Sequence, residues 1–188
     1  EGETLRHTME SLDPDLRARV CAIVATAGTT NLGIVDDLAG VAEVAAELGV
    51  WFHVDGAYGA AGLLAPTRRA LFAGIEHADS FIIDPHKWLF APYDSCALLY
   101  RDPVEARRAH TQHAEYLEVL HGADEVDEPW NPSDFAHHLS RRARGLPLWF
   151  SLATYGTAAY TEAVEACLRL TEAASALIDE LGHVERVV

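Results

Sequence analysis

Short apolar runs that end in polar residues or glycine constrain the fold of this 188-residue chain more than any other feature. The candidate strands are Val20–Thr26, Val50–Val54, Ser80–Ile83 and Ala97–Arg101. Runs of this kind are typical of strands buried in a parallel sheet. Between the first two, Val35–Leu48 has apolar residues at helical spacing, and Gly49 is a helix stop signal. The alternation predicts an open, mainly parallel α/β sheet with helices on both faces.

Helical patterns also occur outside these strands. Thr67–Gly74 and Pro103–His110 fit short helices. The stretch Tyr116–Pro132 is acidic and lacks periodicity, which indicates a solvated loop. The last part is helical again, with a first helix at Trp149–Tyr155 and a long amphipathic helix from about Thr157.

The overall charge limits the kinds of partner. The chain has 14 basic and 29 acidic residues and a formal net charge of −15, which disfavours binding to nucleic acid or to anionic membranes. It contains no uninterrupted apolar run long enough to cross a bilayer. Cys21, Cys96 and Cys167 match no metal or redox spacing, so we expect buried, reduced thiols and a cytoplasmic protein.

Both ends of the sequence indicate an internal piece of a longer protein. Glu1 is not a start methionine and no signal peptide precedes it. At the other end, a new strand is expected to begin at Val184–Val188, directly after a helical stretch and Gly182.

An acid and a lysine follow two neighbouring strands. Asp55 ends the second candidate strand, and Lys87 comes shortly after the third. Ligands of open α/β sheets bind at the carboxyl ends of the strands. When an arbitrary aspartate and lysine lie at neighbouring strand ends, the simplest explanation is that they form a structural ion pair. Here, however, small residues follow Asp55, and Lys87 lies between Pro85 and Trp88, where apolar bulk and a charged His86 would make its amine a nucleophile.

Several motifs carry a resemblance to a known family. S-F-I-I-D-P-H-K-W at Ser80–Trp88 resembles the cofactor-lysine motif of the group II pyridoxal-dependent amino acid decarboxylases, which include the aromatic amino acid, histidine and glutamate decarboxylases. H-V-D-G-A-Y at His53–Tyr58 resembles the family's H-V-D-A-A-Y. An upstream G-T-T, A-D-S-F at Ala78–Phe81 and R-R-A-R-G-L-P-L-W-F at Arg141–Phe150 match in order. The resemblance covers nearly the whole chain.

The resemblance implies a pyridoxal 5′-phosphate cofactor and a role for each matching residue. Lys87 would form the Schiff base with the cofactor, and Asp55 would keep the pyridine nitrogen protonated, so that the ring acts as an electron sink. Ala57 would pack on one ring face, and Thr30 would contact the cofactor near Asp55. His86 would lie near the phosphate or the substrate carboxylate.

One position departs from the family pattern. The residue three before the lysine is often an asparagine that contacts phosphate, and here it is Asp84. An ionised Asp84 would repel phosphate, so a contact requires that it orients a donor or bonds to backbone.

The resemblance further implies the large domain of the fold type I pyridoxal-dependent transferases. Residues 1–150 would form the carboxyl-terminal part of that domain, with a mobile loop at about 116–132. Residues 151–188 would lead to a small domain that the sequence lacks. A homodimer, or association with a chain that carries the missing amino-terminal half, would complete the site.

The implied activity is decarboxylation of an L-amino acid of unspecified identity. An aldehyde synthase or aminotransferase-like enzyme, and a non-catalytic scaffold of the same fold, are the alternatives. In the aromatic relatives a loop tyrosine is thought to supply a proton; an ungapped alignment places Pro132 there, so Tyr116, His137 or His138 would have to serve.

Three weaker signals remain. The glycines of Gly56-x-x-Gly59-x-x-Gly62 do not have dinucleotide-loop spacing. The pairs His110 and His113, and His137 and His138, lack a matching set of Cys or Glu ligands, so no metal site is expected. Three arginines could bind an anion or have a structural role, namely Arg141, Arg142 and Arg144.

Overall fold

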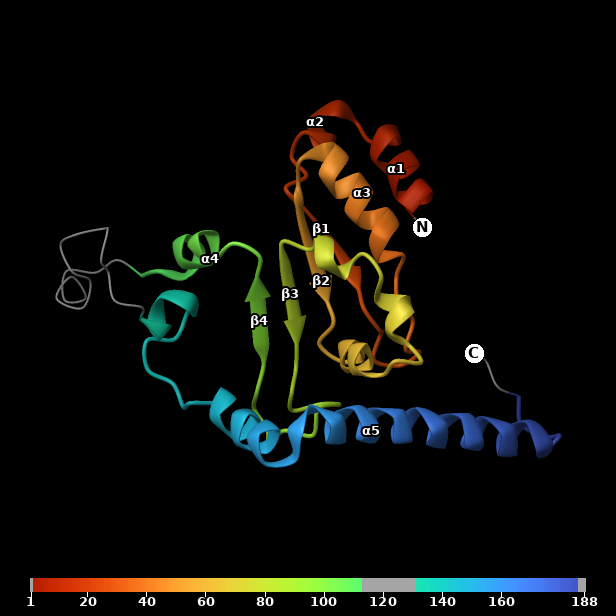
Figure 1. Ribbon diagram of the computed structural model, residues 1–188. Helices are drawn as coiled ribbons and strands as arrows, with labels where there is room; N and C mark the ends of the chain where they lie inside the picture. The colour runs from red at the N-terminus through yellow and green to blue at the C-terminus, as the bar shows by residue number, and fades with distance from the viewer. Residues whose placement is uncertain (1, 113–130, 186–188) are drawn as a thin grey trace. The chain divides into compact units, whose positions relative to one another are not determined.

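The computed structural model describes residues 2–112 and 131–185 (Figure 1). These residues form two compact units, which we describe separately. The first comprises residues 2–99 and 144–185, and the second comprises residues 100–112 and 131–143.

A four-stranded sheet in the order β1-β2-β3-β4 is the centre of the fold. Its strands are β1 (Ala22–Thr26), β2 (Trp51–Asp55), β3 (Ser80–Ile83) and β4 (Ala97–Tyr100). The first three are parallel, and the arrow of β4 runs opposite to that of β3 (Figure 1). All four predicted strands are therefore confirmed to within two residues. Thr26 pairs with Asp55 and Asp55 with Ile82, so the three parallel strands end at one edge.

Helix α3 (Leu38–Leu48) forms the core with one face of this sheet. Gly49 ends it in the left-handed conformation, as predicted, with φ 65°. The helix begins three residues later than predicted. The reason is that Val35 forms a bridge with Ala27, and the Asp36 carboxylate accepts a hydrogen bond from Thr26 N (2.7 Å), so these two residues belong to the edge of β1.

The core consists of small and medium apolar side chains from α3 and the strands. Its fully buried members include Leu38, Ala45, Ala25 and Val54. Val24 points to the other face of the sheet and is 62% exposed. The mostly parallel sheet flanked by helices agrees with the predicted fold class.

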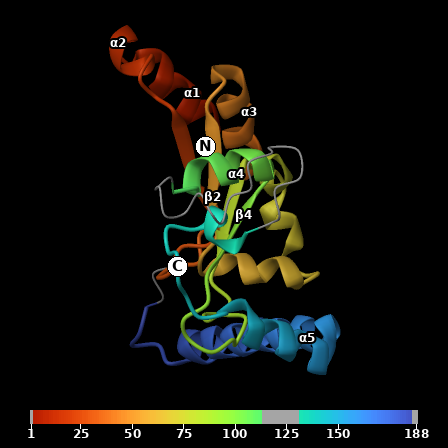
Figure 2. The same cartoon turned by 90° about the vertical axis from the view of Figure 1, so that its left-hand side faces the viewer.

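Two amino-terminal helices were not predicted. They are α1 (Gly2–Ser11) and α2 (Pro14–Arg17). Helix α1 packs on α3, and a Cβ atom on Gly2 would lie 2.7 Å from Gly40 Cα, so glycine permits this close approach. In both views α1 and α2 lie at the opposite end of the sheet from α5 (Figures 1 and 2).

The connection from β2 to β3 contains three 3₁₀ helices. They are η1 (Gly59–Leu64), η2 (Arg69–Phe72) and η3 (Ile75–His77). The α-helix predicted at Thr67–Gly74 is therefore wrong in type. Gly74 has φ 101°, and a Cβ there would lie 2.3 Å from Ala39 N, so the chain has to turn sharply against α3 at this point.

Helix α5 (Gly145–Glu180) is broken at Gly156, which has φ 74° and ψ 163°. The break lies between the two helices predicted from the sequence and confirms that division. The carboxylate of Glu165 accepts a hydrogen bond from Thr67 Oγ1 (2.9 Å), and Glu172 pairs with Arg68 (2.5 Å). These contacts connect α5 to the segment that follows η1.

The second unit contains α4 (Pro103–His110), as predicted, and η5 (Pro132–Phe135). Arg107 Nε lies 3.5 Å from Oδ2 of Asp134, which is buried. The predicted loop lies outside the described residues, apart from its last two positions.

Two further predictions differ from the structure. Cys21 and Cys96 are exposed and Cys167 is half-buried, so the expectation of buried thiols is wrong. Both exposed cysteines flank strands of the sheet and do not point into the core. The expected carboxyl-terminal strand is not formed at Val184 and Glu185, and the rest of it lies outside the described residues. No helix in the described part of the chain has the length and apolar character to cross a membrane.

Candidate cofactor site

Backbone hydrogen bonds join the loops that follow β1, β2 and β3. Ala27 N donates to Asp55 O (2.7 Å), and Gly56 N donates to Ile82 O (3.0 Å). Asp84 N donates to Ala57 O (3.1 Å). The predicted site residues Asp55, Ala57 and Asp84 therefore lie together at the carboxyl edge of the sheet.

Asp55 is the last residue of β2, and its side chain is held by the turn that follows. Its Oδ1 accepts a hydrogen bond from Ala57 N (3.1 Å), which is the local contact typical of aspartate at a turn. Asp55 is exposed and Ala57 is half-buried. The turn fixes the carboxylate, and its second oxygen can accept a hydrogen bond from a ligand.

Two glycines bring the loop after β1 against the loop after β2. A Cβ on Gly28 would lie 2.6 Å from Gly59 Cα, and a Cβ on Gly59 would lie 2.5 Å from Gly28 Cα. Thr30 is exposed in the loop that Gly28 begins. A Cβ on Gly56 would also lie 2.5 Å from Phe81 Cε2, so the glycine series is explained by packing rather than by nucleotide binding.

Lys87 forms an ion pair with Asp84. Lys87 Nζ lies 2.8 Å from Asp84 Oδ2, and the backbone N–H of Lys87 donates to Asp84 O (2.9 Å). Lys87 is also the only lysine in the sequence. The Asp84 carboxylate therefore faces a cation.

Burial acts to raise the pKa of Asp84, but hydrogen bonds and charge outweigh it. The side chains of Lys87 and Cys96 donate to the carboxylate, and the charges of Lys87 and His86 favour its ionised form. The pKa of Asp84 is therefore lowered. Conversely, although the Cys96 residue as a whole is exposed, partial desolvation of its thiol and the hydrogen bond that the thiol donates to Asp84 raise the pKa of Cys96 to about 11.

His86 is held by the turn before β4. Ser95 N donates to His86 Nδ1 (3.1 Å), and the ring of Tyr93 meets the imidazole edge at a centroid distance of 5.0 Å. His86 Nε2 lies 4.0 Å from Asp84 Oδ2. Sequence reasoning missed Ser95 and Cys96, because only the folded turn brings them to the lysine motif.

Two further contacts fix the surrounding loops. Trp88 stacks with Tyr58 at a centroid distance of 6.3 Å, which links the lysine motif to the loop after β2. Arg144 Nε lies 3.1 Å from Asp94 Oδ2, beside the start of α5. The sequence left open whether Arg144 binds an anion or has a structural role, and this ion pair is a structural one. The side chain of Arg141 donates to Pro132 O within the second unit (3.0 Å).

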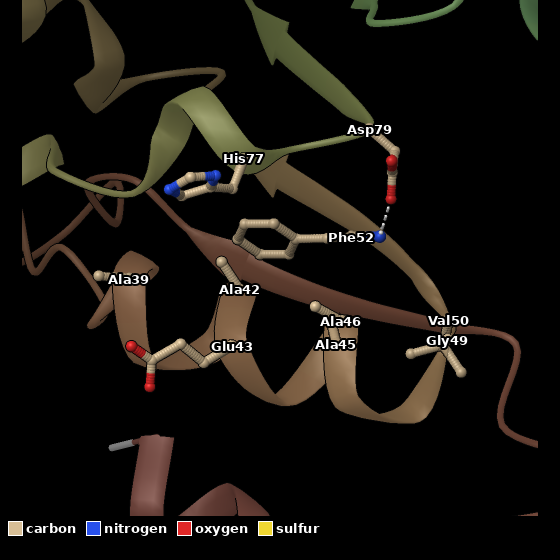
Figure 3. A pocket seen from close by; sticks show the side chains of 10 residues that line it. All are labelled: Ala39, Ala42, Glu43, Ala45, Ala46, Gly49, Val50, Phe52, His77 and Asp79. Atoms are coloured by element: carbon tan, nitrogen blue, oxygen red, sulfur yellow. Dashed lines mark hydrogen bonds between the residues drawn. The ribbon is translucent and has the colours of Figure 1, made fainter.

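A separate pocket of about 470 Å³ lies between α3 and the amino ends of β2 and β3 (Figure 3). Ala42, Ala46 and Phe52 line its apolar wall, and Glu43 and His77 are polar lining residues. It is at the end of the strands opposite to Asp55, so it is distinct from the site described above.

Comparison with known proteins gives the family of the chain. The model of the family described as the pyridoxal-dependent decarboxylase conserved domain matches residues 3–188. An aromatic-L-amino-acid decarboxylase of Bacillus atrophaeus is 36% identical over 165 residues, which are 88% of this chain and 34% of that protein. A phenylacetaldehyde synthase of Petunia hybrida is 38% identical over 131 residues, or 70% of this chain and 26% of that protein.

A solved structure is similar over the whole chain. The tryptophan decarboxylase of Catharanthus roseus, in complex with L-tryptophan, has a TM-score of 0.84 and 29% identity, and the match covers 100% of this chain and 39% of that one. The chain thus spans about a third of the length of these relatives.

The chain belongs to the pyridoxal-dependent decarboxylase family. Its fold is that of the fold type I pyridoxal-dependent enzymes, and the cofactor of this domain is pyridoxal 5′-phosphate. The residues at the sheet edge fit this group, because a lysine side chain, a carboxylate and a small residue lie in adjacent loops at the carboxyl ends of the strands.

Proposed function

We propose that this chain is the cofactor-binding part of an L-amino acid decarboxylase and that Lys87 forms the Schiff base with the cofactor. The observation that carries the proposal is the single edge of the sheet at which Asp55, Ala57 and Lys87 follow adjacent parallel strands. Lys87 is the only lysine that the chain offers for this bond.

When bound, pyridoxal 5′-phosphate draws electrons away from the bond that breaks in the substrate. Asp55 holds a proton on the ring nitrogen through its exposed carboxylate, which Ala57 N keeps in place. Ala57 limits the space on one side of the ring. Thr30, on the loop packed through Gly28, would be a further cofactor contact, and Lys87 would hold the cofactor through its side-chain nitrogen.

His86 has a different role. Its Nδ1 contacts both the backbone N–H and the carbonyl oxygen of Ser95, so the other nitrogen, Nε2, faces Asp84 and the site. A histidine held in this way orients toward an anionic group, either the cofactor phosphate or the substrate carboxylate. His137 and His138 stack at a centroid distance of 3.9 Å in the second unit and are candidates for the proton donor after loss of carbon dioxide.

Aldehyde synthesis is a second candidate function. The phenylacetaldehyde synthase of Petunia hybrida is as similar to this chain as the decarboxylases are, so similarity alone does not separate the two activities. A non-catalytic scaffold would bind the cofactor and convert no substrate.

Product analysis separates these functions. The full-length protein with cofactor is incubated with aromatic and other L-amino acids, and amine, aldehyde, ammonia and peroxide are measured together. Amine without peroxide supports decarboxylation. Aldehyde with equimolar ammonia and peroxide contradicts it in favour of the aldehyde synthase, and no product with any amino acid supports the scaffold.

We further propose that the working form is a homodimer, or an assembly with a chain that supplies the rest of the domain. Sedimentation of the active full-length protein tests this, and an active monomer at nanomolar concentration contradicts it.

A further inference from the structure

The Asp84 carboxylate lies at the centre of a cluster of donors. Lys87 Nζ is 2.8 Å from Oδ2, and His86 Nε2 is 4.0 Å from the same oxygen. The Cys96 thiol donates to the carboxylate as well. The Asp84 side chain is only 12% exposed, whereas that of Lys87 is 35% exposed.

The backbone of Asp84 is fixed on both sides. Its N–H donates to Ala57 O across the sheet edge, and its carbonyl accepts from Lys87 N within the turn. The turn therefore fixes the geometry of the ion pair, unlike that of an ion pair between freely rotating side chains on the surface. A carboxylate at this distance forms a charge-assisted hydrogen bond with the Lys87 side chain, and this bond has to break before the nitrogen can react. Only the amine is a nucleophile.

We propose that Asp84 is a positioning residue whose ion pair holds the Lys87 side chain at the sheet edge and thereby sets the rate at which Lys87 condenses with an aldehyde. The inference rests on the proposed function, because it assumes that Lys87 is the residue that binds the cofactor. It assigns a role to the aspartate that departs from the family's usual asparagine.

The reaction that Asp84 controls is balanced without an oxidant or a reductant. The Lys87 ammonium gives up a proton to solvent, and the amine nitrogen then adds to the aldehyde carbon. A C=N bond replaces the C=O bond, and the oxygen leaves as water. Asp84 loses one partner in this step, but it retains the Cys96 thiol and His86 as neighbours.

The charged and titratable groups near Lys87 in residues 2–99 and 144–185 are few. Asp84 is in contact, and His86 and Cys96 act on the same carboxylate. Asp55 is on the neighbouring strand end, and its Oδ1 is bonded to Ala57 N. Asp84 is thus the anionic group best placed to pair with Lys87.

The test uses the full-length protein, freed of cofactor, and pyridoxal as the probe, because pyridoxal has the aldehyde but no phosphate. Borohydride traps the product at timed intervals, and peptide mapping follows labelling at Lys87. Asp84→Asn should label about five-fold faster than the wild type near neutral pH, as expected for loss of an ion pair that is partly exposed.

Two matched variants make the result specific. Asp84→Glu keeps the charge and should label at close to the wild-type rate. Glu43→Gln removes one negative charge in the pocket at the other end of the sheet and should leave the rate unchanged.

Three outcomes would overturn the inference. They are equal pyridoxal rates in Asp84→Asn and the wild type, equally fast labelling in Asp84→Glu and Asp84→Asn, and acceleration seen with pyridoxal 5′-phosphate but not with pyridoxal. The last would mean that Asp84 acts by repelling phosphate. The failure of the wild type to label at Lys87 with pyridoxal 5′-phosphate is a different result, and it contradicts the proposed function itself.

Discussion

The backbone N–H of Asp84 donates a 3.1 Å hydrogen bond to the carbonyl oxygen of Ala57. This bond continues the pairing of β2 and β3 beyond the last residues of the strands. It brings the turn that carries Lys87 next to the turn that fixes Asp55. Predictions about each partner follow from this arrangement.

Replacement of Asp55 by alanine should lower kcat by orders of magnitude and weaken cofactor binding much less. The reason is that the carboxylate acts on the ring nitrogen rather than on the phosphate. Steady-state kinetics and a cofactor titration measure the two effects. Asp55→Asn, which can still accept from Ala57 N, is the control for turn geometry and should lose turnover as well. A normal kcat in either variant would be inconsistent with the role.

The Cys96 thiol should be a slow target for alkylation. Its pKa is raised to about 11, so at a pH of about 8 it is almost entirely protonated, and only the thiolate reacts. We expect a rate about two orders of magnitude below that of an ordinary thiol with a pKa of about 8.5. Asp84→Asn removes the anion that raises this pKa and should speed the reaction. Timed iodoacetamide labelling with peptide mapping tests this, and rapid alkylation of wild-type Cys96 would contradict it.

Replacement of Gly59 by alanine should loosen the site and destabilise the fold. The new Cβ would lie 2.5 Å from Gly28 Cα, so the two loops have to move apart, at a cost of about 1–3 kcal/mol. Both the cofactor affinity and the free energy of unfolding should decrease in this variant. Gly145→Ala is the matched control, because nothing lies within 4 Å of a Cβ there. Equal effects of the two substitutions would mean that the close approach is unimportant.

Replacement of Asp37 by alanine should lower the free energy of unfolding by about 1 kcal/mol. Asp37 caps α3 by accepting from Gly40 N (3.0 Å), and this bond and one from Gly2 N lower the pKa of its carboxyl. A lowered pKa means that the contribution is complete above the ordinary value of 3.8 and is lost as the pH falls through the lowered one. Asp37→Ser should retain most of the cap. Denaturant titrations at neutral and acidic pH measure both effects.

The sequence predicted the sheet well, because apolar runs and glycine stops report burial and chain reversal directly. Residues 35–37 were assigned to α3 wrongly, since the apolar spacing of Val35 does not reveal its bridge to Ala27. Helix α1 was not predicted, because it is mostly polar and packs through Gly2.

Within the candidate site, Asp55 and Lys87 were found from their motifs, and the doubt about Asp84 came from its charge. Its ion pair with Lys87 depends on the exact turn, which spacing alone does not give. Cys96 and Ser95 approach the motif only through the fold. The relevant signal that was overlooked in the sequence itself was the single lysine.

The central claim is that Lys87 carries the cofactor. The direct measurement is borohydride reduction of the full-length protein with bound pyridoxal 5′-phosphate, followed by peptide mapping. The account predicts one modified peptide, containing Asp84-Pro85-His86-Lys87-Trp88, and loss of the modification and of activity in Lys87→Ala. Cofactor attached at a different residue, or activity retained in Lys87→Ala, would contradict it.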